Sequence, residues 1–328
     1  DNFSGEPVYN GICGQWHKAT YAFSLNVLLS LSNKESVSTF NIKQRFADIV
    51  NAALLMKSNR DNFITKYADE TGKFHPLYNG SKFTLNTMLS NTLVEPLKAL
   101  NDYRLFYYGE PSKVKIDGGL FENDMNAYVG VDVEIPYNEV NSIYNSKDYS
   151  QINNRYHLQK VPESLVLIGY AEQQLILAEA VIRGWISGSA EEYYKSGVIA
   201  ALSFVKDTGT TYAHGCPITD DYIASYFTGE AAFKSSEQER LEQIWLQRYL
   251  LHFMQDATSS YYEYRRNTYP VFPSDPATSL NENKKGAIPL RWLYPSGETT
   301  TNRDNLDAAL KSQYDGYDEI NKQMWLLK

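Results

Sequence analysis

Tyrosine and asparagine side chains are dense between residues 103 and 156, in a chain of 328 residues with 26 tyrosines. The candidate ligand-binding residues there are Tyr107, Tyr108, Tyr128, Tyr137, Asn138, Tyr144, Asn145 and Tyr149. A sugar ring has an apolar C–H face and a rim of hydroxyls, so flat aromatic rings and amide groups complement it. The pattern therefore predicts a carbohydrate site. A second interpretation stays open for each tyrosine, that it fixes this segment to the body of the protein.

Motifs for catalysis and for cofactors do not occur in the sequence. It has no nucleophile elbow, no phosphate-binding loop, no dinucleotide fingerprint and no pair of histidines at zinc-protease spacing. The acidic pairs Asp69–Glu70 and Asp220–Asp221 are more typical of solvated loops than of the paired carboxylates of a glycosidase. Oxygen ligands near glycines do not have the spacing of the twelve-residue calcium loop; they are Asp117, Glu122, Asp124 and Asn126. We predict no catalytic residue, no metal and no cofactor.

Charge and composition argue against further classes of protein. The net charge of −8 and the pI near 5.3 leave no broad positive field for phosphates, so a nucleic-acid partner is not expected. No apolar run reaches the roughly 20 residues that span a bilayer, and the first residues lack the regions of a signal peptide. Two cysteines, Cys13 and Cys216, allow either one disulfide or two free thiols.

Apolar spacing of three and four residues predicts helices that must position these side chains. The expected helices cover about 16–31, 43–57, 86–100, 171–185, 191–206, 236–253 and 305–312. Two of them, 171–185 and 191–206, are expected to form a helical hairpin, and Ser236 with Glu239 has capping-box spacing. Pro96 is expected to kink or end its helix.

The intervening segments are predicted to be irregular. Residues 59–83 are polar and contain Gly72, Pro76 and Gly80, and residues 101–156 show no sustained helical period. We expect the second of these to be loop with short strands, and long loops inside a compact domain are usually functional or disordered. Prolines after Arg266 predict an extended tail. The fold class is thus mainly α.

Three segments together resemble the SusD/RagB family. They are Tyr-Ala-Glu-Gln-Gln-Leu-Ile-Leu-Ala-Glu-Ala at 170–180, Tyr-Glu-Tyr-Arg-Arg-Asn-Thr-Tyr-Pro at 262–270 and Ile-Pro-Leu-Arg-Trp-Leu-Tyr-Pro-Ser-Gly-Glu at 288–298. Weaker similarity extends to Trp16-His17-Lys18 and to Asn101-Asp102-Tyr103-Arg104, which lacks the family's proline. The order and spacing of the three segments match the family pattern.

The resemblance implies a SusD-like α/α fold with tetratricopeptide-like helical hairpins. It implies one domain over 1–328, the carboxy-terminal portion of a longer protein. Within it, the tyrosine- and asparagine-rich residues 101–156 are expected, from their composition, to form a loop-rich ligand-binding insertion. It also implies a cell-surface location at the outer membrane, a lipidated amino terminus outside this chain, and a SusC-like TonB-dependent transporter as partner. No catalytic residue comes with the family, and its recurring residues are expected to determine the fold; here they are Glu172, Glu179, Arg265, Arg266, Pro295 and Glu298.

Three functions remain open at this point. The first is non-catalytic capture of an oligosaccharide or polysaccharide for the transporter. The second keeps the fold but binds peptide, as RagB-like uptake proteins do, through pairing with exposed backbone. The third is a glycoside hydrolase whose two carboxylates are brought together only by the fold.

Overall fold

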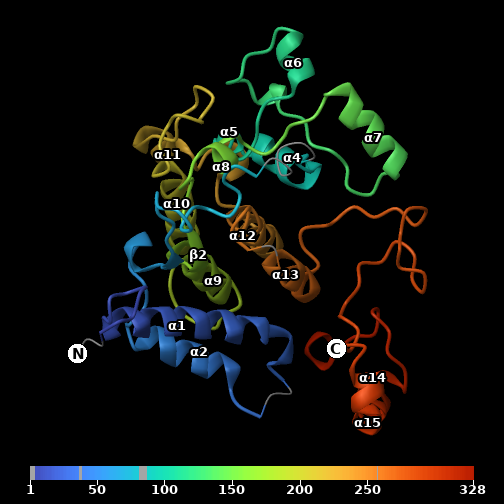
Figure 1. The fold of residues 1–328 in the computed structure, drawn as a ribbon. Helices are drawn as coiled ribbons and strands as arrows, with labels where there is room; N and C mark the ends of the chain where they lie inside the picture. The colour runs from blue at the N-terminus through green and yellow to red at the C-terminus, as the bar shows by residue number, and fades with distance from the viewer. Residues whose placement is uncertain (1–3, 37–38, 81–86, 257) are drawn as a thin grey trace.

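The computed structural model describes residues 4–36, 39–80, 87–256 and 258–328, and it is mainly helical, as predicted (Figure 1). Its helices are α1 (Cys13–Ser30), α2 (Ile42–Asn51), α4 (Asn91–Ala99), α5 (Arg104–Tyr108), α6 (Lys113–Asp117), α7 (Tyr137–Ser146), α8 (Arg155–Leu158), α9 (Tyr170–Ile182), α10 (Ala190–Lys206), α11 (Asp220–Ser225), α12 (Glu237–Leu251), α13 (Ser259–Asn267), α14 (Glu298–Thr301) and α15 (Arg303–Tyr314). Within the described ranges the only sheet has two antiparallel strands, β1 (Phe63–Thr65) and β2 (Leu165–Ile168).

Helix α9 lies at the centre of the fold, packed against α10, α12 and α1. It is buried on nearly all sides, including the polar side chains Gln173 and Glu179. A buried amide needs partners, and Gln173 finds them by accepting from the backbone N–H of Met56 and donating to its carbonyl, both at 3.0 Å. The hairpin predicted for α9 and α10 is confirmed.

Gly197 lets α10 approach α9 closely. A Cβ at this position would lie 2.9 Å from Leu175 Cγ and 3.0 Å from the carbonyl oxygen of Ala171. Contacts that short do not occur for real Cβ atoms, so only glycine permits this separation of the two helices.

The predicted capping box at the start of α12 is confirmed. Glu239 donates its backbone N–H to Ser236 Oγ at 3.3 Å, and its carboxylate accepts the backbone N–H of Ser236 at 3.3 Å. The helix expected over 43–57 is shorter, because α2 ends at Asn51 and Ala53 adopts a left-handed φ of 56°.

One prediction for the middle of the chain was wrong. Residues 101–156 contain the helices α5, α6, α7 and α8 in place of short strands (Figure 1). Helices of five residues or fewer, such as α5, α6 and α8, do not show the periodicity by which helices are recognised in sequence, and α7 buries no side chain, so it has no buried apolar face to mark it. Pro96 lies inside α4 and does not end it, since the helix continues to Ala99; the alternative, a kink, stays a prediction. The helix expected over 86–100 begins only at Asn91, and residue 86 lies outside the described residues.

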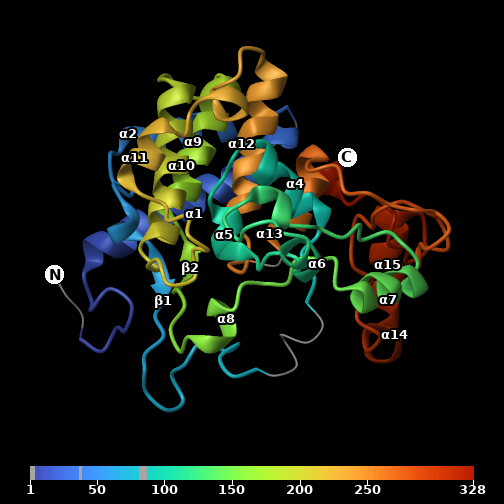
Figure 2. The same ribbon diagram turned by 90° about the horizontal axis from the view of Figure 1, so that it is seen from above.

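Residues 268–328, here called the arm, form the extended tail that the prolines predict, and they extend away from the central helices (Figure 2). The helix expected near 305–312 is confirmed as α15. The arm has a small core of its own, built from Leu306, Leu310 and Tyr314. No helix in the described part of the chain is long and apolar enough to cross a membrane.

Candidate functional site

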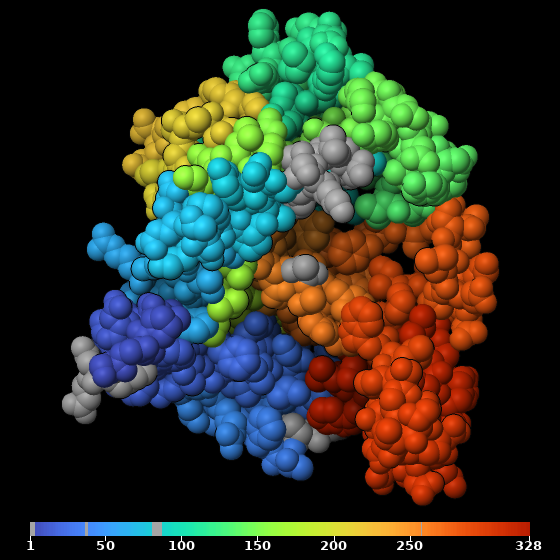
Figure 3. Space-filling view, viewed as in Figure 1, coloured from blue at the N-terminus to red at the C-terminus, as the bar shows by residue number. Residues whose placement is uncertain are grey.

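Helix α7 brings four of the eight candidate residues together on the outside of the molecule (Figure 3). Tyr137 and Tyr144 are seven positions apart, so they lie on one side of the helix about 10 Å apart along its axis. Asn138 and Asn145 have the same spacing on the adjoining side and are exposed. The tyrosine pair and the asparagine pair thus run in parallel along one helix.

The rings on α7 differ in how firmly they are held. Tyr137 is 79% exposed, so both faces of its ring meet solvent. Tyr144 is half-buried and stacks on Tyr149, with ring centroids 6.0 Å apart and planes 25° apart. Lys147, which ends the helix in a left-handed conformation, lies with Nζ 3.9 Å from the centre of the Tyr144 ring. One ring is therefore free and the other is fixed in position.

The other four candidates lie in the core, which corrects the expectation that their rings stack on a ligand. Tyr107, Tyr108, Tyr128 and Tyr149 are no more than 4% exposed. Burial raises the pKa of Tyr108 to about 12, and its hydroxyl donates to the carbonyl of Leu250. Tyr128 donates to the carbonyl of Glu122 at 2.9 Å. For these residues the second interpretation, attachment of the segment to the body, is the one the structure supports.

An aromatic surface at the base of the arm was not among the predicted site residues. The ring of Tyr261 on α13 lies 5.6 Å from that of Tyr262 and 6.1 Å from that of Trp292 in the arm. Trp292 is 73% exposed. Arg265 lies over both tyrosine rings, 5.1 and 4.8 Å from their centres. The sequence contained a signal, because tyrosines three and four positions before an arginine lie on its side of a helix. Trp292 joins them only through the fold.

The described residues form neither a metal site nor a disulfide. Among the described residues, no group of three or more histidines, cysteines, aspartates and glutamates is placed to hold a metal ion. Cys13 and Cys216 are both free thiols, which decides between the two alternatives left open by the sequence.

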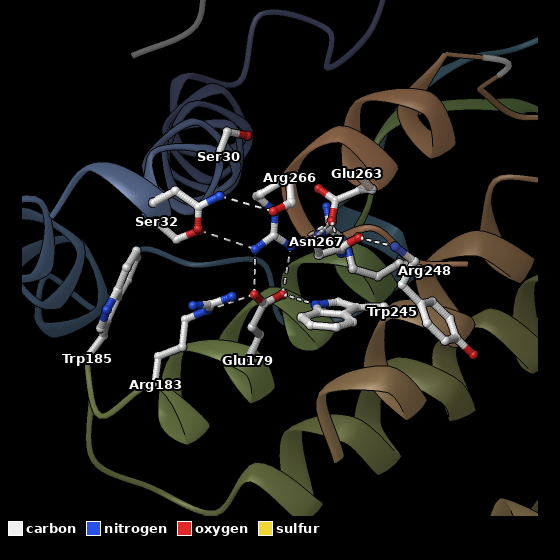
Figure 4. A network of polar contacts seen from close by, with 12 residues as sticks. Ser30, Ser32, Glu179, Arg183, Trp185, Trp245, Arg248, Glu263, Arg266 and Asn267 are labelled. Carbon is white, nitrogen blue, oxygen red and sulfur yellow. Dashed lines mark hydrogen bonds and ion pairs between the residues drawn. The ribbon is translucent and has the colours of Figure 1, made fainter. Parts of the chain in front are cut away.

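A buried charge network surrounds Glu179 of α9 (Figure 4). Arg266 donates to its two carboxylate oxygens at 2.6 and 3.0 Å, Arg183 donates at 2.8 Å and Trp245 at 2.9 Å. Burial acts to raise the pKa of Glu179, but the neighbouring guanidiniums, first that of Arg266, outweigh it and lower the pKa to about 2. The carboxylate is therefore ionised and fully partnered.

Arg248 extends this network along α12. It pairs with Glu172 at 3.0 Å and with Glu263 at 2.9 Å, and Glu263 in turn pairs with Arg266 at 2.6 Å. Burial acts to raise the pKa of Glu172, but His252 and Arg248 outweigh it and lower the pKa to about 2. Every carboxylate of the network thus has a cation beside it, which is an arrangement that fixes helices.

The family model described as "Starch-binding associating with outer membrane", of the SusD-like type, matches residues 1–295. This chain belongs to the SusD family. The description of the SusD family links it to starch binding and to the outer membrane. A search of the curated proteins gave no match.

Solved structures agree with this SusD assignment. A SusD homologue from Bacteroides fragilis NCTC 9343 is 41% identical, with a TM-score of 0.94, and the match covers 100% of this chain and 70% of that one. An outer-membrane protein from Bacteroides vulgatus ATCC 8482, assigned to nutrient binding, is 35% identical with a TM-score of 0.90 over the same shares. A chitin-binding protein shares the fold, at 24% identity and a TM-score of 0.76. That match covers 99% of this chain and 67% of the chitin-binding protein.

The SusD segments quoted from the sequence supply the charge network. Glu172 and Glu179 come from the first segment, and Arg265 and Arg266 from the second. Glu179 and Arg266 form the central ion pair, which supports their expected role in the fold of this SusD-family chain. Arg265 is different, because it donates to the backbone of Leu290 and lies over aromatic rings without entering the network.

Proposed function

We propose that this SusD-family chain captures an oligosaccharide or polysaccharide at the cell surface, without cleaving it, and delivers it to a SusC-like TonB-dependent transporter. The exposed aromatic and amide side chains of α7 carry the proposal, because a member of a starch-binding family presents them to solvent on one helix. In this scheme the protein is held at the outer membrane by a lipid anchor, and residues 101–156 form the ligand-binding insertion.

The geometry of α7 suits an extended glycan. Tyr137 offers a free ring face for the apolar side of a sugar. Two helical turns away, Tyr144 supplies a second, half-buried ring that Tyr149 and Lys147 hold in position. Asn138 and Asn145 can each donate and accept hydrogen bonds to hydroxyl groups beside those rings. Two stacking positions and two amides would together hold a chain of sugars along the helix.

Calorimetry against a panel of neutral polysaccharides tests this function. Binding is expected to at least one glycan, and the double variant Tyr137→Ala/Tyr144→Ala should weaken it at least about 10-fold, equivalent to about 1.4 kcal/mol. Tyr317→Ala is the matched control, since it removes a tyrosine that is 56% exposed on the arm and should leave affinity unchanged. Equal losses in both variants would contradict a site on α7.

Two further measurements separate the alternatives. Release of new reducing ends from a bound glycan would indicate a glycoside hydrolase, and none is expected. Heterogeneous peptide found by mass spectrometry in the purified protein, with no glycan bound, would instead indicate a peptide-uptake protein. Co-purification of the transporter with the tagged protein from outer membranes tests the delivery step.

A further inference from the structure

A pocket lies where the end of α1, helix α13 and the last residues of the arm meet. It has a volume of about 140 Å³. Its walls are Ser30, Asn33, Tyr262, Glu263, Arg265, Arg266, Leu326 and Leu327. Figure 3 shows the last part of the arm, in dark red, lying against the blue amino-terminal helices. We call this the arm pocket. It is far along the chain from α7 and shares no residue with it.

Arg265 gives the arm pocket a positive charge without a counter-ion. Its Nη1 donates to the carbonyl of Leu290 at 2.8 Å and contacts Met324 Sδ at 3.4 Å, and both partners are neutral. Its Nε is buried without a hydrogen-bond partner. Among the described residues no carboxylate lies within ion-pair distance of this guanidinium.

The neighbouring charges do not compensate Arg265. The adjoining network has three glutamates and three arginines that pair with one another; these are Glu172, Glu179, Glu263, Arg183, Arg248 and Arg266. Arg265 is therefore one cation in excess beside a balanced set. A half-buried guanidinium favours a carboxylate partner, which it can bind through two hydrogen bonds.

The rest of the surface favours a sugar as the carrier of that carboxylate. Tyr262 is 47% exposed at the pocket, and Trp292, 73% exposed, lies with its ring 6.1 Å from that of Tyr261. Exposed ring faces beside a hydrogen-bonding amide, here Asn33, are the complement of a sugar ring. Leu326 and Leu327 add apolar wall to the pocket. Glu263 and Arg266 also line it but pair with each other at 2.6 Å, so Arg265 is the lining charge that is left for a ligand.

We propose that the arm pocket binds an acidic sugar, a uronic acid within an oligosaccharide, with its carboxylate on Arg265 and its ring against Tyr262. The adjoining sugar of the oligosaccharide would lie against Trp292, outside the pocket and on the far side of Tyr261. This inference rests on the proposed glycan-binding function and deepens it, because it names a charged substrate class and a second site. The neutral part of the same glycan would remain with α7.

Calorimetry with trigalacturonic acid and its fully methyl-esterified, neutral form tests the proposal. The acid should bind at least about 10-fold more tightly than the ester, and the difference should shrink as salt is raised. Trp292→Ala and Tyr262→Ala should each weaken binding of the acid about 5-fold or more, because both lose an exposed stacking surface. Arg265→Lys should weaken it while keeping the charge, since lysine cannot bind a carboxylate with two parallel hydrogen bonds.

Controls keep this outcome separate from that of the proposed function. Tyr137→Ala/Tyr144→Ala should leave binding of the acid trimer unchanged, and all variants are checked for an unchanged melting temperature. Equal affinity for acid and ester would overturn the inference, and so would competition by triglutamate at the same concentration as the acid trimer. If the protein still binds a neutral glycan in either case, the function proposed for α7 is unaffected.

Discussion

The guanidinium of Arg266 meets the carboxylate of Glu179 through two hydrogen bonds, of 2.6 and 3.0 Å, across 87 positions of the chain. Both side chains are at least 95% removed from solvent. The contact joins α13, from which the arm departs, to α9 at the centre of the fold. An ion pair at this depth is stabilising only when both members are present, since either one alone is a buried charge without a partner.

Glu179→Gln should therefore destabilise the protein severely. The substitution keeps the shape of the side chain but leaves Arg183 and Arg266 without their shared anion, and we expect a loss of about 3–5 kcal/mol in the free energy of unfolding. Urea denaturation measures it. Arg303→Ala is the control, because it breaks an ion pair with Asp307 that is exposed on α15 and should cost less than about 0.5 kcal/mol.

Stability should fall with acid because of the same network. The pKa values of Glu172 and Glu179 are about 2 in the folded protein and near 4.5 when unfolded. Between these two pKa values the unfolded chain binds more protons than the folded protein does. The stability that the two glutamates contribute is therefore complete above about pH 5 and is lost as pH falls toward 2. Urea midpoints from pH 7 down to pH 3 check this. Midpoints that stay level over that range would contradict the paired, ionised state of both glutamates.

Gly197→Ala should destabilise the α9–α10 hairpin. The added methyl would lie within 3.0 Å of the Ala171 carbonyl oxygen, which is backbone and cannot turn away, and we expect a cost of about 1–3 kcal/mol. Gly14→Ala is the matched control within α1, since nothing lies within 4 Å of the position that its methyl would occupy, and there alanine should be neutral or slightly stabilising. Thermal melts of the two variants should therefore shift in opposite directions or by clearly different amounts.

Tyr128→Phe should affect stability but not glycan affinity. The ring is fully buried, and its hydroxyl donates to the carbonyl of Glu122, so its removal should cost about 1 kcal/mol. Calorimetry with the best neutral glycan should return the affinity of the unaltered protein. A loss of affinity in this variant, measured at a temperature at which it is fully folded, would return Tyr128 to the binding site.

The helices that could be predicted from sequence are those with enough turns to show a period. α9, α10 and α12 bury apolar side chains at steps of three and four residues, and Ser236 with Glu239 marks the start of α12. Of the helices in 101–156, α5, α6 and α8 are too short for that signal, and α7 has no buried side chain to produce it. Their end points depend on contacts with distant segments, such as Glu110 N–H donating to the carbonyl of Gln151.

Composition predicts a chemistry for the candidate site but cannot say which of its residues are exposed. Tyr128 and Tyr137 are the same residue type in the same segment, yet one is fully buried and the other is 79% exposed. Burial is decided by which elements cover a side chain, and nothing local to either tyrosine encodes that. The surface of Tyr261, Tyr262 and Trp292 was missed for the same reason, because its third member comes from the arm.

Because the arm has a small core of its own, ligand binding in the arm pocket can be measured in a second way. Leu306, Leu310 and Tyr314 pack with Tyr294 and Met324, in a cluster separate from the core of the central helices. We therefore expect the arm to open as a unit of its own while the central helices stay closed. The arm pocket takes walls from both sides, Asn33 from the body and Leu327 from the arm. An occupant that bridges them would hold the arm shut, and amide hydrogens of α15 would then exchange with deuterium more slowly in proportion to ligand concentration.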